Sequence, residues 1–210
     1  MSLQKNRELH KYSADESLKL DLGKDSNIEY IPNFINDQDS KKYLEELKSL
    51  DEWMHGTYSM FGKDIKTPRL LWSMRDKKYE LPDGYSVTGS SVYTPLINKL
   101  RKKVEKYTKC KLLYAQLNYY RDGKDYIGWH TDSEVEDGDI IASISLGETR
   151  KFSLKNRDYK KTNNEVKHEL MLKNGSLLIM DSNAAKKYWK HTLPKMKTDN
   201  LRFNLTFRNK

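Results

Sequence analysis

The chain has 210 residues, of which 36% are hydrophobic and 33% charged. This length predicts one domain with enough residues to bury a core. No apolar run reaches the roughly 20 residues of a membrane span, and no apolar stretch follows the first basic residues, so we expect neither a span nor a signal peptide. The single cysteine, Cys110, excludes an internal disulfide and is typical of a reducing compartment, so we expect an intracellular soluble protein of the nucleus or cytoplasm.

The net charge of +9 favours a polyanionic partner. Nucleic acid is the first candidate and an anionic membrane surface the second. A generic soluble basic protein carries the same charge, so the charge narrows the partner and leaves the chemistry open.

Residues 1–26 are polar, with alternating charges and little periodicity, which predicts a disordered or loosely attached tail. Asn36 is typical of a helix cap, and the apolar positions after it predict a helix over 37–50. A hydroxyl residue followed by proline at Thr94-Pro95 predicts the start of a second helix. Between these helices, residues 53–92 are punctuated by glycine and proline, which predicts short strands and long loops.

After Cys110 the pattern becomes β. Predicted strands cover residues 112–121, 126–131, 139–146, 150–155, 166–172, 176–181 and 201–208. They are short and separated by turn residues, which indicates a sandwich or barrel, and residues 156–165 read as a polar hairpin loop. Helices followed by a run of strands predict an α+β, mainly β fold, a jelly-roll double sheet with helices buttressing one side.

The segment 117–132 ends in His130 and Asp132. In an extended chain these two side chains leave the same face, because side-chain direction repeats every second residue. Two histidines and one carboxylate hold Fe(II) in non-haem oxygenases, and His191, just before a proline turn and the C-terminal strand, is the best third ligand. The alternative is a loop histidine beside a solvated aspartate. The remaining histidines lie in less suitable segments: His10, His55 and His168.

The C-terminal strand 201–208 alternates apolar and polar residues. Its polar face carries Arg202, Asn204, Thr206 and Arg208. Two guanidiniums on one strand face suit a small dicarboxylate, since each can bind a carboxylate bidentately. An edge strand with a solvated polar face is the alternative. Strand 112–121 shows a similar division, with Asn118 and Tyr120 on one side.

Together these residues resemble the AlkB family of Fe(II)- and 2-oxoglutarate-dependent dioxygenases, from about Tyr30 to Arg208. The shared motifs are Asn118-x-Tyr120, His130-x-Asp132, Ser143-x-Ser145-x-Gly147, the downstream His191 and the segment Arg202 to Arg208. The resemblance implies that 27–210 is one dioxygenase domain. In it, 27–110 would supply the substrate lid and supporting helices, and 111–210 the jelly-roll core.

The resemblance also implies roles for the site residues. His130, Asp132 and His191 would bind Fe(II). Arg202 and Tyr120 would hold the distal carboxylate of the co-substrate 2-oxoglutarate. Its metal-chelating end would meet Arg208, Asn118, Asn204 and Thr206. The family uses O2 to oxidise a methyl group on a base nitrogen, which leaves as formaldehyde.

Substrate contacts follow from the same resemblance. Ser133 and Glu134 stand where the family places base-recognising residues, and a carboxylate there would accept the exocyclic amine of 1-methyladenine or 3-methylcytosine. The alternative is that Glu134 opens a solvated acidic loop. Arg69 lies in a segment, Thr67 to Leu70, that is similar to the family's substrate lid.

Phe61, with Gly62 and Lys63, looks like the segment that duplex-repair members wedge into the base stack, a known use of apolar side chains. The alternative is a hairpin tip whose phenylalanine packs on the lid. One departure concerns stacking on the flipped base, because the family's aromatic position is Val87 here. Tyr85 or Trp72 would then supply the stacking, or base selectivity differs.

We therefore expect a monomeric dioxygenase that repairs methylated bases, with DNA preferred over RNA and no membrane partner. An RNA or single-strand demethylase with the same chemistry is the first alternative. A non-catalytic nucleic-acid-binding module on the same fold is the second, and an oxygenase acting on a protein or a small molecule is the third.

Overall fold

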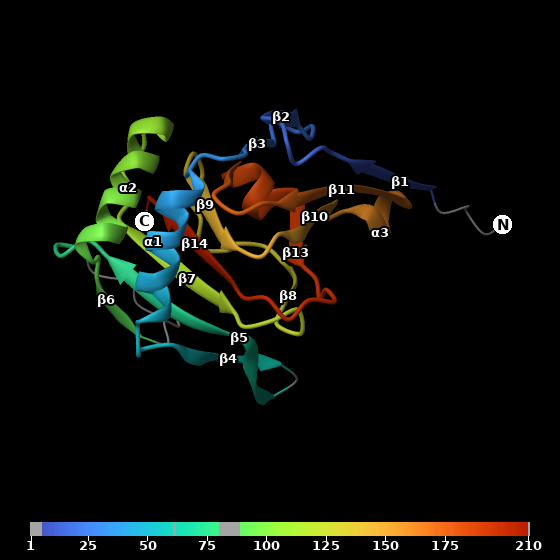
Figure 1. Cartoon of the computed structure of the whole chain (residues 1–210). Coiled ribbons are helices and arrows are strands. Elements are labelled where there is room, and N and C mark those ends of the chain that lie inside the picture. Colours follow the sequence, from blue (N-terminus) through green and yellow to red (C-terminus); the bar gives the residue numbers. More distant parts are fainter. Residues whose placement is uncertain (1–5, 61, 80–88, 210) are drawn as a thin grey trace.

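Two β-sheets and two helices make up most of the molecule (Figure 1). The computed structural model describes residues 6–60, 62–79 and 89–209. Within these ranges, no helix combines the length and apolar character that a membrane crossing requires.

The larger sheet has nine strands in the described part of the chain. They are β2 (Leu18–Asp21), β3 (Asn27–Ile31), β4 (Met54–Met60), β5 (Lys63–Arg75), β6 (Ser90–Val92), β7 (Tyr114–Tyr120), β9 (Ile140–Gly147), β12 (Leu177–Asp181) and β14 (Arg202–Arg208). Their order is β2-β3-β12-β9-β14-β7-β5-β4, with β6 paired to β5.

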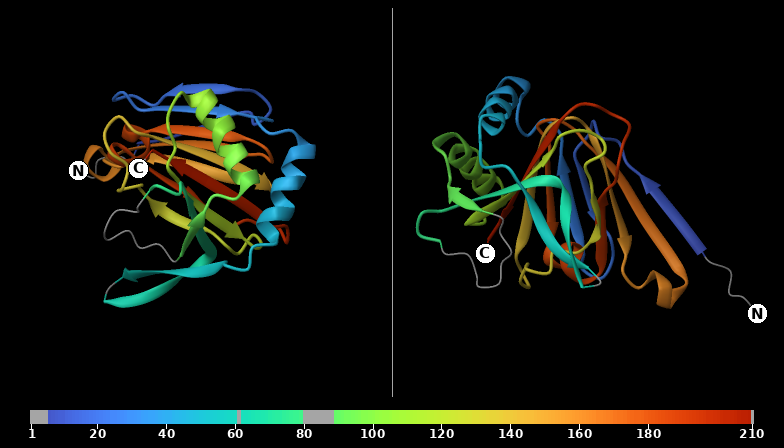
Figure 2. Two further views of the ribbon diagram at one scale, coloured as in Figure 1. Left: turned by 90° about the vertical axis from the view of Figure 1, so that its left-hand side faces the viewer. Right: turned by 90° about the horizontal axis from the view of Figure 1, so that it is seen from below.

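The smaller sheet has five strands in the same described ranges. They are β1 (Asn6–Lys11), β8 (Ile127–His130), β10 (Arg150–Asn156), β11 (Asn164–Leu172) and β13 (Trp189–Leu193). Their order is β1-β11-β10-β13-β8, and every pair except β1 with β11 is antiparallel. The two sheets face each other (Figure 2), so the predicted mainly β jelly roll is confirmed.

Alternation along the strands divides the apolar residues between two cores. Between the sheets, Ile141 and Met180 of the larger sheet belong to one buried cluster with Phe152, Leu170 and Trp189 of the smaller sheet. A second cluster lies between the larger sheet and the helices. Its members include residues of β7, β9 and β14 on one side and of both helices on the other.

Both predicted helices form and buttress the larger sheet (Figure 2). Helix α1 (Asp37–Lys48) is capped by Asn36, whose side chain accepts a hydrogen bond from the Asp39 amide at 2.8 Å. Helix α2 (Pro95–Thr108) starts after Thr94, whose hydroxyl accepts from the Ile97 amide at 3.2 Å. Capping residues and apolar spacing therefore located both helices.

Each strand predicted after Cys110 is present with slightly shifted ends, and β10 and β11 form the expected hairpin. Its connection contains one helical turn, α3 (Tyr159–Thr162). Two elements were not predicted, the π-helical turn η1 (Asn183–Lys187) and strand β13. Strand β13 matters because it carries His191.

The prediction of short strands and long loops over 53–92 is wrong for its first part. Strands β4 and β5 form one long antiparallel hairpin, and β5 has 13 residues. The register shifts between His55 and Thr57, opposite the segment that contains Pro68. The bulge lies in β5, where residues 67–69 lie opposite Gly56 alone. It accommodates a proline that cannot donate to the ladder, so Pro68 does not end the strand.

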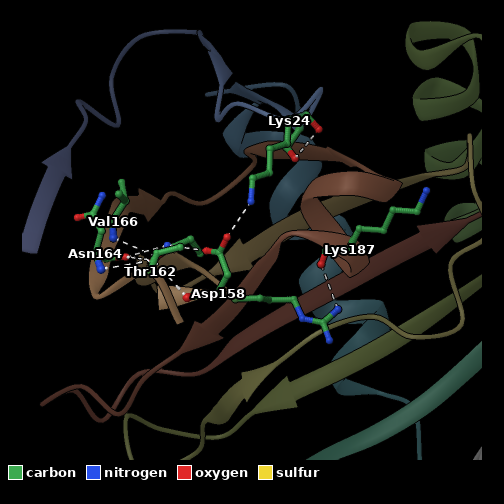
Figure 3. Close-up of polar contacts among 9 residues, drawn as sticks. Lys24, Asp158, Thr162, Asn164, Val166 and Lys187 are labelled. Carbon is green, nitrogen blue, oxygen red and sulfur yellow. Dashed lines mark hydrogen bonds and ion pairs between the residues drawn. The ribbon is translucent and has the colours of Figure 1, made fainter. Parts of the chain in front are cut away.

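The prediction that residues 1–26 form a disordered or loose tail is wrong for the described residues 6–26. Strand β1 pairs in parallel with β11, and β2 pairs with β3. Tyr12 after β1, Leu18 and Leu20 of β2, and Leu22 just after β2 pack against the core between the sheets. Lys24 reaches the loop after β10 and bonds Asp158 at 2.8 Å (Figure 3).

Candidate metal and co-substrate site

Three side chains that the sequence selected as metal ligands converge between the two sheets. His130 ends β8, His191 lies in β13, and the two are direct cross-strand neighbours. Asp132 follows in the turn, where its amide donates to Ala185 O at 3.0 Å. The ligand atoms of all three lie within 4.8 Å of one another, and His191 Nε2 is 3.1 Å from Asp132 Oδ2. This is the two-histidine, one-carboxylate donor set of non-haem Fe(II) sites.

Neighbouring groups orient these ligands. His130 Nδ1 lies 2.8 Å from Gly128 O, which can only accept, so Nδ1 carries the proton and Nε2 keeps its lone pair. Arg208 Nη2 donates to Asp132 Oδ1 at 3.1 Å and to Glu134 Oε1 at 2.8 Å. The other Asp132 oxygen faces His191. These contacts orient His130 and Asp132, whereas His191 Nδ1 has no hydrogen-bond partner among the described residues.

The electrostatics of the cluster favour the protonation states that bind a cation. Burial, together with the nearby His191, lowers the pKa of His130 to about 4, so His130 is neutral at physiological pH. Burial alone would raise the pKa of Asp132. The charges of His191 and Arg208 outweigh that effect and hold the pKa below its usual range. A neutral imidazole beside an ionised carboxylate is the state that a divalent metal requires.

A cavity of about 260 Å³ opens beside the three ligands. Strands β7 and β14 form its polar wall, because Tyr120 pairs with Arg202 and Asn118 with Asn204 in one antiparallel register. The residues expected at the co-substrate all line it: Asn118, Tyr120, Arg202, Asn204, Thr206 and Arg208. The alternative that the C-terminal strand is a solvated edge is wrong, because β14 lies between β9 and β7.

The chain matches the 2OG-Fe(II) oxygenase superfamily over residues 27–208. It is 31% identical to the DNA oxidative demethylase ALKBH2 of Mus musculus, over 81% of this chain and 74% of the relative. This chain belongs to the AlkB family. It is also 29% identical to the DNA oxidative demethylase ALKBH2 of Arabidopsis thaliana, over 93% of this chain and 70% of that protein. It is 30% identical to the human alpha-ketoglutarate-dependent dioxygenase alkB homolog 3, over 87% of this chain and 66% of that relative.

As an AlkB-family enzyme the protein uses Fe(II), 2-oxoglutarate and O2. Arg202 shows that the cavity fits a dicarboxylate. Its side chain is 1% exposed, and Nη2 donates to Ser145 Oγ at 2.8 Å, whereas Nε and Nη1 have no hydrogen-bond partner among the described residues. Burial lowers its pKa to about 10, which leaves the guanidinium charged. A buried cation with two donor nitrogens unused requires an anionic partner, and a carboxylate can accept hydrogen bonds from them.

The neighbouring amides of this AlkB-family site form a network of their own. Asn204 Nδ2 donates to Ser143 Oγ at 2.6 Å, and the Thr206 hydroxyl donates to Asn204 Oδ1 at 2.9 Å. Asn118 Nδ2 donates to the same oxygen at 3.4 Å. These bonds fix the polar wall before any ligand arrives, which is the pre-organisation that a specific site requires.

The residues expected at the substrate fall into two groups. Arg69 and Glu134 line the cavity, and Arg69 Nε donates to Asn118 Oδ1 at 2.6 Å. Ser133 is exposed and does not belong to the described cavity lining. Gly62 and Lys63 lie at the turn between β4 and β5, where Gly62 has a φ of 71°.

Phe61, Tyr85 and Val87 lie outside the described residues. Trp72, the other residue considered for stacking on a base, belongs to the core on the helix side of the larger sheet. Its indole nitrogen donates to Ser91 Oγ at 3.0 Å. Trp72 therefore points away from the cavity, and its assignment as a stacking residue is wrong.

Sequence reasoning missed the apolar half of the cavity wall. Its lining includes Leu71, Ile127, Ile141, Phe152, Leu172, Leu178, Met180 and Leu193. Their alternation within β9, β10, β11 and β12 was visible in the sequence. Which of the alternating positions face a cavity depends on how the two sheets pack, and strand patterns do not specify that.

Proposed function

We propose that this AlkB-family enzyme removes methyl groups from base nitrogens in DNA, with 1-methyladenine and 3-methylcytosine as the lesion type. The carrying observation is that the three-ligand cluster and the unpaired donors of Arg202 line one cavity. This arrangement supports binding of a metal beside a dicarboxylate. The DNA oxidative demethylases among its relatives supply the substrate class.

In this proposal His130, Asp132 and His191 hold Fe(II). Arg202 and Tyr120 bind the distal carboxylate of 2-oxoglutarate. The residues that meet its chelating end are Asn118, Asn204, Thr206 and Arg208. When bound there, iron with 2-oxoglutarate and O2 supplies the oxidising power that hydroxylates the methyl group, and the adduct then releases formaldehyde.

The protein's own residues position the base. Arg69 and Glu134 lie on the cavity wall, where a base extruded from its stack would enter. The Glu134 carboxylate accepts a hydrogen bond from the exocyclic amine of the base, while Arg208 holds the same carboxylate through Oε1. The apolar residues from the smaller sheet exclude water around the methyl group.

The finer assignments concern the partner and the place of action. We propose DNA in preference to RNA because two of the compared relatives are named DNA demethylases. We propose a monomer, because the three metal ligands and the co-substrate residues of a single chain suffice to line one cavity. The lone Cys110 supports a reducing compartment, the nucleus or cytoplasm. An RNA or single-strand demethylase with the same chemistry is the second candidate. The sequence identity to alkB homolog 3 is similar to that of the DNA demethylases, and the name of alkB homolog 3 gives no substrate.

Mass spectrometry of short oligonucleotides tests the proposal. Strands carrying 1-methyladenine or 3-methylcytosine are offered single- and double-stranded, as DNA and RNA, with Fe(II), ascorbate and 2-oxoglutarate. We expect loss of the methyl mass that depends on 2-oxoglutarate and is absent in His130→Ala. Slow consumption of 2-oxoglutarate with no reaction on any strand would refute the nucleic-acid substrate and leave the iron site in place.

The same variant decides against a non-catalytic binding module. His130→Ala should lose turnover while it keeps its fold and its affinity for oligonucleotides, because His130 is a metal ligand at a strand end. Turnover that survives in this variant would refute the metal assignment.

A further inference from the structure

The outer face of the smaller sheet carries an unusual group of side chains. We call Trp129, Lys155, Tyr159, Lys167 and Lys190 the lysine–tryptophan face. Lys155 follows Leu154 and Lys190 precedes His191, and the side chains of Leu154 and His191 point inward. The two lysines therefore leave the opposite side of the sheet. Contacts between Lys155 and the rings of Trp129 and Tyr159 place those residues on the same side.

Three lysines lie next to one another across three strands of this face. Lys155 of β10 pairs directly with Lys167 of β11 on one side and with Lys190 of β13 on the other. Like charges directly opposite in a sheet are destabilising. Glu165 offsets part of the repulsion, at 3.9 Å from Lys155 and 3.7 Å from Lys167, but it is also paired with Arg7 at 3.7 Å. The face keeps a positive charge at the expense of stability, which suggests an anionic partner.

Aromatic rings are interleaved with these lysines. Lys155 Nζ lies 4.4 Å from the centre of the Trp129 ring and 4.6 Å from that of Tyr159, and Lys167 Nζ lies 6.0 Å from the Trp129 ring. Trp129 is nevertheless 38% exposed. An exposed indole among cations is a platform on which a nucleobase stacks while the cations meet its phosphates. Among polyanions, a nucleic acid is the one whose bases stack on an exposed indole while its phosphates meet the lysines, which favours it over an acidic protein or a lipid headgroup.

This face is continuous with the cavity. Trp129 and the metal-ligand residue His130 are consecutive in β8, and β8 ends the described order of the smaller sheet. A strand of nucleic acid therefore has only one β-strand to pass between the cavity and the lysine–tryptophan face. Tyr126, just before β8, has Lys195 Nζ at 5.0 Å from its ring, which extends the same combination along this edge.

We propose that the nucleotides flanking the lesion bind on the lysine–tryptophan face, with their phosphates on Lys155, Lys167 and Lys190 and one base stacked on Trp129. This proposal rests on the proposed function, because it takes the lesion-bearing strand as the occupant. It adds where the strand runs after it leaves the cavity.

Fluorescence anisotropy with unmodified thymidine oligonucleotides of about 5 and about 15 nucleotides tests the proposal, over about 50 to 200 mM salt. The triple variant Lys155→Gln, Lys167→Gln, Lys190→Gln should bind the longer strand at least about tenfold more weakly, with a salt slope flatter by about 2. The matched control changes three exposed helix lysines, Lys41, Lys99 and Lys106, to Gln and removes the same charge. It should bind as the wild type does.

Trp129 distinguishes nucleic acid from other polyanions. Trp129→Ala should weaken binding of the longer strand about five- to a hundredfold, and Trp129→Phe should keep most of the affinity. Equal binding of the triple variant and its control, or an alanine variant with full affinity, would overturn the proposal. Competition by polyglutamate that is as effective as an equally charged oligonucleotide would also overturn it.

A second measurement does not depend on the variants folding. Photocrosslinking of the wild type to a strand with bromodeoxyuridine beside the lesion should label Trp129 or Tyr159, as located by mass spectrometry of peptides. Crosslinks confined to residues of the β4–β5 hairpin would refute the proposed path. If the wild type repairs methylated strands while the triple variant binds like its control, only the path is wrong. If it binds through this face and repairs nothing, only the proposed function is wrong.

Discussion

The position of Glu134 is consistent with two different roles, reading the base and orienting Arg208. Its carboxylate lines the cavity, where a base would enter, and it also pairs with Arg208 at 2.8 Å. Glu134→Gln keeps the size and removes the charge. If Glu134 reads the base, the ratio of kcat/KM for 1-methyladenine to kcat/KM for 3-methylcytosine should change by about tenfold. The reason is that the hydrogen bond to the charged carboxylate stabilises the two bases to different extents, so its loss affects them unequally.

The exposed neighbour Ser133 provides the control for this measurement, since Ser133→Ala should leave the ratio unchanged. A Glu134→Gln variant in which both substrates lose the same factor would contradict base reading. It would leave Glu134 as a partner of Arg208 that orients Asp132.

Arg150 has a role that is visible only in the structure. It is 0% exposed, and its guanidinium donates to Asp122 O at 3.2 Å, Asp125 O at 2.9 Å and Pro194 O at 2.8 Å. It therefore joins the loop before β8 to the loop after β13. Arg150→Met should lower the free energy of unfolding by about 3 kcal/mol, because three carbonyls lose their donor.

Urea denaturation measures this loss, and Arg157→Met is the matched control. Arg157 also donates to two carbonyls, those of Lys186 and Lys187, but it is exposed and water replaces it. The control should lose less than about 1 kcal/mol. Similar losses in both variants would show that Arg150 does not join the two loops.

Most of the metal and co-substrate residues could be identified from the sequence because their chemistry is local. His130 and Asp132 are two residues apart, and the alternation in 201–208 placed four polar side chains on one face before any fold was known. Arg150 could not be identified in this way. Its partners are backbone carbonyls of two distant loops, and no side-chain pattern marks a carbonyl.

At the scale of the elements, the strap formed by β1, β2 and their connection changes the environment of His168. The His168 ring stacks on His10 at 4.9 Å, and its Nδ1 is hydrogen-bonded to the Tyr12 hydroxyl at 2.7 Å. Burial, together with the nearby His10, lowers the pKa of His168 to about 4. The sequence analysis set this histidine aside because the residues that cover it were assigned to a tail.

The strap gives the protein a pH-dependent stability. Unfolded His168 titrates near 6.5 and folded His168 near 4, so the unfolded state binds more protons between these values. The free energy of unfolding should fall as pH decreases through this window and level off below it. His130 contributes in the same window when no metal is bound. His168→Gln should reduce the dependence by the share of His168, which thermal melts of the metal-free protein at several pH values would measure.

An equal pH dependence in the wild type and His168→Gln would show that the strap does not exclude water from His168.

The composition of the strap explains the wrong prediction for residues 6–26. Every side chain of β1 is exposed, so this strand shows no apolar alternation and is held by its pairing with β11. The alternating Leu18, Leu20 and Leu22 were a usable signal, but the charges between them gave the segment the composition of a tail.

At the scale of the whole molecule, the charged groups of the site lie inside a sandwich whose core is mostly apolar. Arg202, Arg208 and Asp132 are each buried, and burial of charged groups opposes folding unless they are paired. Without ligands, Arg202 keeps two donors without partners among the described residues. The fold therefore carries a local instability that a metal and a dicarboxylate can remove.

Ligand binding should consequently stabilise the entire fold. With Mn(II) in place of Fe(II), 2-oxoglutarate at a hundredfold excess over its Kd should add about 2.7 kcal/mol to the stability of the Mn(II)-loaded protein. For a chain of this size that raises Tm by about 5 to 10 °C in differential scanning fluorimetry. His191→Ala should abolish the response to the metal. Arg202→Met should keep the response to Mn(II) alone and lose the increment from 2-oxoglutarate, because only the distal carboxylate needs the guanidinium. An increment that survives in Arg202→Met would place the distal carboxylate elsewhere in the cavity.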